Sequence, residues 1–489
     1  MRLVARIPFL SLLSWASPLV VLSAMDITTP FLRMLVLTHF LDLRELGFAA
    51  ALATTLGLFE QVTDMLMYRF VFSVPHEDFV KALAAAHAVS VVRGAAVGLL
   101  VALASPIAAS IFGLGDDWAI FAALGPIVFI RSLENLGPRS AERDYQYAAQ
   151  LKSNLVGATL GLGSMLLVAI RTHSHLALYV QLLASASGYV AGTHLFSSTP
   201  YRLKIRTLFF ARAIRFGYPL MLNGAGLAIT NQGDRMLVGA LLGLPALAIY
   251  SVILLAAIVP MAMLTRMTNS LTLAIFYGAA AFRAAYEARL KLTGRVFPLL
   301  FAFYGLGVLT LANILVPDVF GASFRMSKTL LVLLAFSAFF RLLRGDPFAS
   351  LLLQTSRTKR LALSSWSTTG ALIFAGALMY AFRTIESAML GRLLGEIVAL
   401  AVTVYLVRNL YRIALADHAL ATAFGTAVLG IAAALVFIAP VGTQIFPSLA
   451  ALALGAASLA GAAALTARAE LREGFPHDLF GRGTGGGAA

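Results

Sequence analysis

The 489-residue sequence has no cysteine and few charged residues. Without cysteine the chain has no disulfide framework, thiolate metal site or cysteine nucleophile. Charged residues make up 12% of the chain, about half the share typical of soluble domains. The eight histidines follow no metal-ligand spacing, and the sequence contains no P-loop. We therefore expect neither a metal site nor an ATP-hydrolysing site of its own.

Apolar residues, at 60% of the chain, form long runs from end to end. Each run of about 18 or more residues can cross a hydrocarbon core of about 30 Å. The sequence therefore predicts an all-α polytopic membrane protein with about fourteen transmembrane helices. The first apolar run is too long for a cleaved signal peptide, so we expect it to be retained. The predicted spans are 9–40, 46–72, 83–112, 118–137, 153–171, 174–197, 213–243, 246–276, 296–316, 326–344, 361–381, 388–407, 419–440 and 447–467.

The distribution of basic residues predicts the orientation. Of the 37 Lys and Arg residues, 23 fall in the loops on the side of both termini. The opposite loops hold only Arg44, Arg171, Arg325 and Arg383. Cytoplasmic loops are enriched in Lys and Arg, so we expect both termini in the cytoplasm. The net charge of +15 then reflects membrane topology, and we expect no nucleic-acid partner.

An internal repeat is indicated by matching strings about 200 residues apart. "RMLV" begins at Arg33 and again at Arg235, and Pro18 and Pro219 precede them at a similar spacing. A repeat of six spans gives two copies with the same orientation, with substrate sites typically between the lobes. We expect an N-terminal six-helix lobe at 1–200 and a second at 201–412. An added helix pair at 413–468 and a disordered cytoplasmic tail at 469–489 follow.

Charged residues inside the spans are the main functional signal. A charge at the centre of a bilayer costs about 2.5–3.5 kcal/mol on insertion scales, so most of these residues must face a hydrated cavity or one another. The embedded basic residues are Arg33, Arg69, Arg93, Arg131, Arg235, Arg266, Lys328, Arg341, Arg344 and Arg392. The embedded acids are Asp26, Glu60, Asp64, Glu134, Asp234, Asp346 and Glu396. Because the embedded charges are mostly arginine, which binds phosphate bidentately, they favour an anionic substrate.

Two acid arrangements allow more than one interpretation. Glu60 and Asp64 are four residues apart, so we expect them on one helix face, where one can hold its proton near neutral pH. The alternative is that each pairs with an arginine on a neighbouring helix. The adjacent Asp234 and Arg235 point about 100° apart on a helix. We expect Arg235 to face the cavity, with Asp234 either bonded to a neighbouring helix or carrying a proton.

Three stretches resemble a known family of transporters. They are "FGYPLMLNGAGLAITNQGDRMLVGALLGLPALAIYSVILLAAIVPMAML" at 216–264, "FLDLRELGFAAALATTLGLFEQVTDM" at 40–65 and "VPDVFGASF" at 316–324. The first stretch begins with an aromatic-Gly-x-Pro motif and also contains an Asp-Arg pair and the string "LVGALLG". These features resemble the polysaccharide-transporter (Wzx-like) flippases of the multidrug/oligosaccharidyl-lipid/polysaccharide (MOP) superfamily. The resemblance implies two six-helix lobes around a cationic cavity, in the bacterial inner membrane.

The resemblance also implies a function. The chain would carry an oligosaccharide on undecaprenyl pyrophosphate from the cytoplasmic to the periplasmic leaflet, for exopolysaccharide, capsule or O-antigen synthesis. Membrane lipids, a polysaccharide polymerase and a chain-length regulator are the expected partners. We expect no cofactor; protons, sodium or the membrane potential would drive transport. The candidate substrate-binding cations are Arg33, Arg93, Arg131, Arg235, Arg266 and Arg341. The candidate ion-coupling or structural acids are Asp26, Glu60, Asp64 and Asp234.

Three other functions stay open at this point. A lipid II-type flippase shares the span count and the cationic cavity. A MATE-like antiporter for organic cations should have a cavity dominated by acids, whereas the embedded residues here are mostly basic. A membrane polysaccharide polymerase or ligase is expected to build its site in a large periplasmic loop, and the outer loops here are short. We therefore expect a transporter without enzymatic activity.

Overall fold

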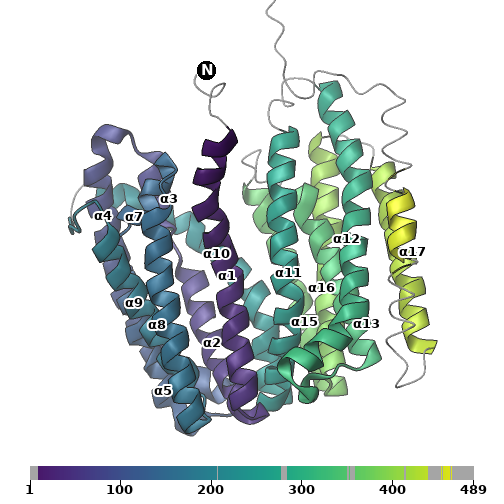
Figure 1. Cartoon of the computed structure of the whole chain (residues 1–489), viewed down its shortest axis with the longest axis horizontal. Helices are drawn as coiled ribbons and strands as arrows, with labels where there is room; N and C mark the ends of the chain where they lie inside the picture. The colour runs from purple at the N-terminus through teal and green to yellow at the C-terminus, as the bar shows by residue number, and fades with distance from the viewer. Residues whose placement is uncertain are drawn as a thin grey trace, which may run out of the picture. The chain divides into compact units, whose positions relative to one another are not determined.

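The computed structural model describes residues 9–205, 208–276, 283–349, 352, 358–411, 415–438, 453, 455–462 and 464. Over these residues every regular element is helical and no strand occurs (Figure 1), which confirms the all-α prediction. The α-helices are α1 (Phe9–Phe40), α2 (Leu43–Thr63), α3 (Met67–Ser73), α4 (Phe79–Ile111), α5 (Trp118–Ala122), α6 (Leu124–Ser132), α7 (Gly137–Ser140), α8 (Ala148–Thr172), α9 (Leu176–Phe196), α10 (Leu208–Leu242), α11 (Leu244–Phe276), α12 (Arg283–Phe320), α13 (Lys328–Leu343), α15 (Thr358–Phe382), α16 (Ile385–Tyr411) and α17 (Ala416–Ile438).

Many of these helices are long and apolar enough to cross a membrane. Among the described residues, 9 helices meet this condition, or 10 if the bent pair Gly115–Ser132 and Gly137–Asp144 is one span. Each predicted span from 9–40 to 419–440 overlaps at least one helix. The last predicted span, 447–467, lies largely outside the described residues, as does the predicted tail. The chain is thus a multi-pass membrane protein, and the number fourteen stays a prediction.

The chain divides into two compact units. Unit 1 comprises Met1–Val259, Val316–Arg325 and Ser365–Gly395, and unit 2 comprises Pro260–Leu315, Met326–Ser364 and Glu396–Ala489. Four of the five boundaries fall inside α11, α12, α15 and α16, so each of these helices contributes to both units. The predicted division into lobes at residues 200 and 412 rests on the sequence repeat and stays a prediction.

Local sequence explains why α2 begins and ends where it does. The Asp42 side chain accepts a hydrogen bond from the backbone N–H of Glu45 at 2.8 Å, which caps the first turn. At the other end, Asp64 is extended and accepts from the N–H of Leu66 at 2.9 Å. Such local bonds compete with helix hydrogen bonding. The predicted span 46–72 is therefore two helices, α2 and α3, with Leu66 in the left-handed region between them.

Close helix packing in unit 1 depends on glycine. At the contact of α4 with α6, a Cβ atom on Gly125 would lie 2.4 Å from the backbone oxygen of Gly98. Helices α8 and α9 lie side by side (Figure 1), and Gly157 of α8 meets Ser185 and Tyr189 of α9. Small residues let helix backbones approach closely within a membrane. These contacts fix α6, α8 and α9, which provide the polar side chains described below.

We predict that Gly125→Ala destabilises unit 1. The new methyl group overlaps the backbone of α4, which cannot move as a side-chain end can, so we expect a loss of about 1–3 kcal/mol. The measurement is the melting temperature of the purified protein in detergent. Gly163→Ala is the matched control, because a Cβ atom there meets nothing within 4 Å. Equal melting temperatures for the two variants would contradict the prediction.

Candidate functional site

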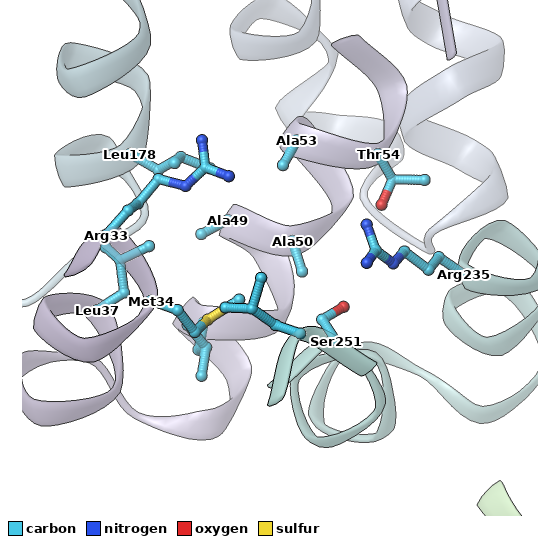
Figure 2. A pocket seen from close by; sticks show the side chains of 12 residues that line it. Arg33, Met34, Leu37, Ala49, Ala50, Ala53, Thr54, Leu178, Arg235 and Ser251 are labelled. Atoms are coloured by element: carbon cyan, nitrogen blue, oxygen red, sulfur yellow. The ribbon is translucent and has the colours of Figure 1, made fainter. Parts of the chain in front are cut away.

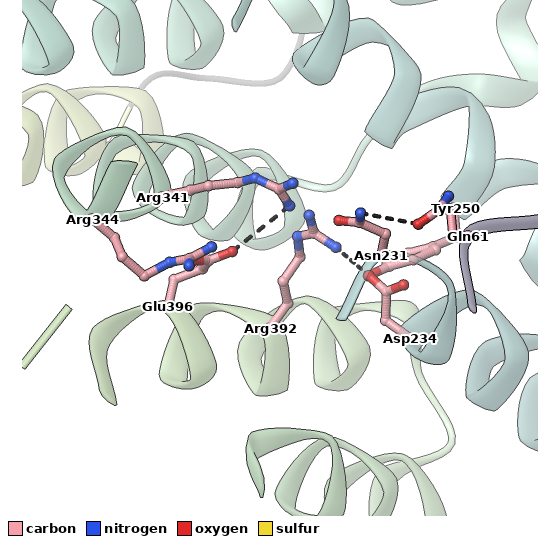
Figure 3. Close-up of polar contacts among 8 residues, drawn as sticks. All are labelled: Gln61, Asn231, Asp234, Tyr250, Arg341, Arg344, Arg392 and Glu396. Atoms are coloured by element: carbon pink, nitrogen blue, oxygen red, sulfur yellow. Dashed lines mark hydrogen bonds and ion pairs between the residues drawn. The ribbon is translucent and has the colours of Figure 1, made fainter. Parts of the chain in front are cut away.

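The adjacent charges on α10 have different surroundings. Asp234 is buried, with 2% of its surface exposed. Its carboxylate accepts a hydrogen bond from the Tyr250 hydroxyl of α11 at 2.8 Å and forms an ion pair with Arg392 of α16 (Figure 3). This is the first of the two arrangements considered for Asp234, a bond to neighbouring helices. The pair neutralises an acid and a base that would otherwise be costly inside a membrane.

Arg235 points elsewhere, as expected for the next residue along a helix. Its guanidinium lines a small cavity of about 70 Å³ together with Arg33 of α1. In Figure 2 the two arginines flank the face of α2 that carries Ala50, Ala53 and Thr54. None of the described residues that line this cavity is acidic. The Nε atom of Arg235 is buried and has no hydrogen-bond partner among the described residues.

A larger cavity of about 340 Å³ lies in the same unit, between α1, α2, α6, α7, α8 and α9. Arg33 lines this cavity as well, and Arg131 and Arg139 add two further positive charges. Asp26 is the acid among its described lining residues. The volume lies at the lower end of the range for small-molecule pockets, about 300–1,000 Å³. Both cavities are therefore dominated by arginine.

The α8–α9 side of the larger cavity is polar but uncharged. Its polar residues are Gln150, Asn154, Gln181, Ser185 and Tyr189. The side-chain oxygens of Gln150 and Gln181 are buried without a hydrogen-bond partner among the described residues. A buried polar group left without a partner costs about 1–3 kcal/mol. Both glutamines line the cavity.

Two of the predicted cations pair with predicted acids. Arg131 reaches Glu60 of α2 at 3.4 Å, and 60% of its side chain is exposed where it faces the larger cavity. Arg93 of α4 donates to the Thr63 carbonyl at 3.1 Å and lies 3.7 Å from Asp64. Each acid is therefore matched with an arginine on a neighbouring helix, as in the alternative interpretation of these residues.

The expectation that Glu60 and Asp64 share one helix face stays a prediction. Helix α2 ends at Thr63 with Asp64 as its C-cap, and the Asp64 side chain accepts a hydrogen bond from the Leu66 N–H. Helix α6 likewise ends at Ser132, just before Glu134.

The remaining predicted cations belong to unit 2. Arg341 lies 3.7 Å from the carboxylate of Glu396, which also accepts from Arg344 at 2.9 Å (Figure 3). Only 3% of the Glu396 side chain is exposed. Arg266 is an exposed residue of α11. Of the six predicted cations, Arg33, Arg131 and Arg235 therefore line the cavities of unit 1. The roles assigned to all ten candidate residues stay predictions.

Several residues of the larger cavity were absent from the sequence-based list. Arg139 follows the predicted span 118–137 and was counted among the cytoplasmic loop residues, yet it sits in α7 with its guanidinium 4.1 Å from the centre of the Tyr68 ring. Gln150 and Gln181 carry no charge. A search for charged residues inside the predicted spans therefore could not find them. A search for amides at one helix face of an apolar span would have found them.

The chain belongs to a family of proteins involved in polysaccharide synthesis. Residues 36–329, more than half of the chain, match the family described as "Polysaccharide biosynthesis protein". This family was expected from the resemblance of the three sequence stretches. Comparison with curated protein sequences gave no match.

Solved structures with a similar fold are transporters of the MOP superfamily. One is the lipid II flippase MurJ in an inward closed conformation, with a TM-score of 0.65 and 11% identity, over 92% of this chain and 99% of that one. Another is a multidrug resistance MATE family transporter in an inward-facing conformation, with a TM-score of 0.53 and 15% identity, over 79% of this chain and 94% of that one. At these identities the likeness shows the fold.

We predict that Asp234→Asn destabilises unit 1, because the variant leaves Arg392 buried without its acid. Breaking a buried ion pair by removing one partner typically costs about 3–5 kcal/mol. The double variant Asp234→Asn/Arg392→Gln removes both charges and should recover most of the loss. The measurement is the melting temperature of the purified variants. A single variant as stable as the wild type would contradict the prediction.

Proposed function

We propose that the chain is a flippase that moves a lipid-linked oligosaccharide across the bacterial inner membrane by alternating access. The observation that carries this proposal is the pair Arg33 and Arg235, which face one cavity whose described lining residues include no acid. Two such charges attract an anion, and guanidinium binds phosphate with two parallel hydrogen bonds. Membership of a polysaccharide biosynthesis family supports a sugar-bearing phosphate as that anion.

The proposed substrate is an oligosaccharide on undecaprenyl pyrophosphate. The arginines would hold the pyrophosphate in the aqueous cavity while the polyprenyl tail stays in the lipid. With both termini in the cytoplasm, transport would run from the cytoplasmic to the periplasmic leaflet, for exopolysaccharide, capsule or O-antigen synthesis. A polysaccharide polymerase and a chain-length regulator would receive the product. No step of this cycle requires catalysis by the chain.

The driving force follows from charge. A membrane potential contributes about 2.3 kcal/mol per elementary charge per 100 mV, and an inside-negative potential favours outward movement of an anion. Proton or sodium coupling would need an acid that changes its charge. Asp234, Glu60 and Asp64 each lie beside an arginine, which favours a structural role. Asp26, which lines the larger cavity, is the proposed coupling acid if ions drive transport.

Two alternative functions are compared with the charges that line the cavities. An antiporter for organic cations needs a cavity rich in acids, whereas the cavities of unit 1 are rich in arginine. A lipid II flippase would use the same cationic residues, so the substrate must be identified by experiment. Depleting the protein from its host should cause complete lipid-linked repeat units to accumulate on the cytoplasmic side. Unchanged lipid-linked oligosaccharide, together with new drug sensitivity, would reject the proposal, and accumulation of lipid II would favour the alternative flippase.

We predict that Arg235→Glu lowers transport of a lipid-linked oligosaccharide in proteoliposomes by about 10- to 100-fold, since a lost hydrogen bond to a charged group is worth about 1.5–3 kcal/mol. Arg33→Glu should have a similar effect. Arg171→Glu is the matched control, because this exposed arginine at the end of α8 lines neither cavity. Insertion and yield are measured alongside transport. Normal transport by Arg235→Glu would contradict the proposed role of the cavity.

A further inference from the structure

The larger cavity of unit 1 has two chemically different sides. Arg33, Arg131 and Arg139 come from α1, α6 and α7, whereas Gln150 and Gln181 come from the α8–α9 pair. We call the uncharged side, formed by Gln150, Asn154, Gln181, Ser185 and Tyr189, the amide wall. A ligand that fills this cavity therefore meets charge on one side and neutral hydrogen-bonding groups on the other.

The amide wall is held in place before any ligand arrives. Gln150 is 5% exposed, and its amide lies 3.1 Å from the Tyr189 hydroxyl and 3.4 Å from the Asn154 side chain. Gly157, which also lines the cavity, packs against Ser185 and Tyr189 of this wall. Such close contacts leave little room for α8 and α9 to shift relative to one another.

Each glutamine nevertheless has a side-chain oxygen that bonds none of the described residues. Both recorded contacts of Gln150 use the same end of its amide, so the other end is left over. Gln181 is 3% exposed, and its side-chain oxygen has no partner among the described residues. A side-chain amide carries two donor hydrogens and an acceptor oxygen, which is the combination that neighbouring hydroxyl groups on a neutral ring can satisfy.

We infer that the amide wall binds the sugar next to the diphosphate and selects among sugars by their hydroxyl groups. This inference rests on the proposed function and adds a specificity site to it. The charged side cannot make this choice, because every lipid-linked substrate carries the same diphosphate. The wall carries no charge, so it binds a neutral polar ring rather than a second phosphate. Buried amides reject a ligand that lacks the matching hydroxyl, because they are then left unpaired.

Gln181→Met is the most informative variant. Methionine has a similar length, and the replaced oxygen has no partner among the described residues of the empty protein. The variant should therefore be about as stable as the wild type and lose affinity only for a ligand that bonds this side-chain amide. Gln150→Met is the second variant, and Thr159→Val is the control, because Thr159 is an exposed residue of α8 outside the cavity.

The experiment measures binding of four probes to the full chain in nanodiscs. The probes are undecaprenyl diphosphate alone and the same lipid bearing glucose, galactose or N-acetylglucosamine. We expect at least one sugar to tighten binding to the wild type. Gln181→Met should weaken that probe about tenfold, the effect of losing one good hydrogen bond, and leave undecaprenyl diphosphate unchanged. Gln150→Met should do the same, and Thr159→Val should bind all probes normally.

Other outcomes separate this inference from the function on which it rests. If the wild type binds undecaprenyl diphosphate but no sugar tightens binding, the sugar site is rejected and the flippase proposal stands. Equal weakening of all probes by Gln181→Met also rejects the sugar site, because the residue then supports the cavity as a whole. If the wild type binds none of the probes, the proposed function fails and this inference fails with it.

Discussion

The ion pair between Asp234 and Arg392, completed by the Tyr250 hydroxyl, is the interaction on which the site in unit 1 depends. It joins α10, α11 and α16 within that unit. Removing one partner of a buried ion pair is costly, because the charge that remains has no water to solvate it. The Asp234 carboxylate also accepts a hydrogen bond from the backbone N–H of Arg235, whose side chain lines the small cavity.

Arginine in unit 1 has two kinds of surroundings. Arg93 and Arg131 lie beside acids on neighbouring helices and help hold α4 and α6 against the end of α2. Arg33 and Arg235 face a cavity whose described lining contains no acid. Arg131 touches Glu60 and also lines the larger cavity, whose described lining residues include Asp26. Counting embedded charges is thus less informative than asking which of them already have a counterion.

The sequence predicted the helices well and the site only in part. Long apolar runs require helices in a membrane, so spans such as 9–40 could be placed closely. The break at Asp64 gave no such signal, because a local hydrogen bond to the Leu66 N–H follows the end of α2 within a mostly apolar stretch. Partners such as Glu60 and Arg131, 71 residues apart, depend on which helices pack together. No single-helix pattern contains that information.

The two arginines of the small cavity make a bound anion part of the protein's own charge balance. While the cavity is empty, Arg33 and Arg235 repel each other across a region of low dielectric constant, where charges interact more strongly than in water. An anion between them removes that repulsion and acts as a counterion of the folded chain. Ligand that binds only the folded state stabilises it by RT ln(1 + [L]/Kd), which keeps rising with ligand concentration. For the anionic substrate proposed above, the melting temperature would therefore report binding before any transport assay.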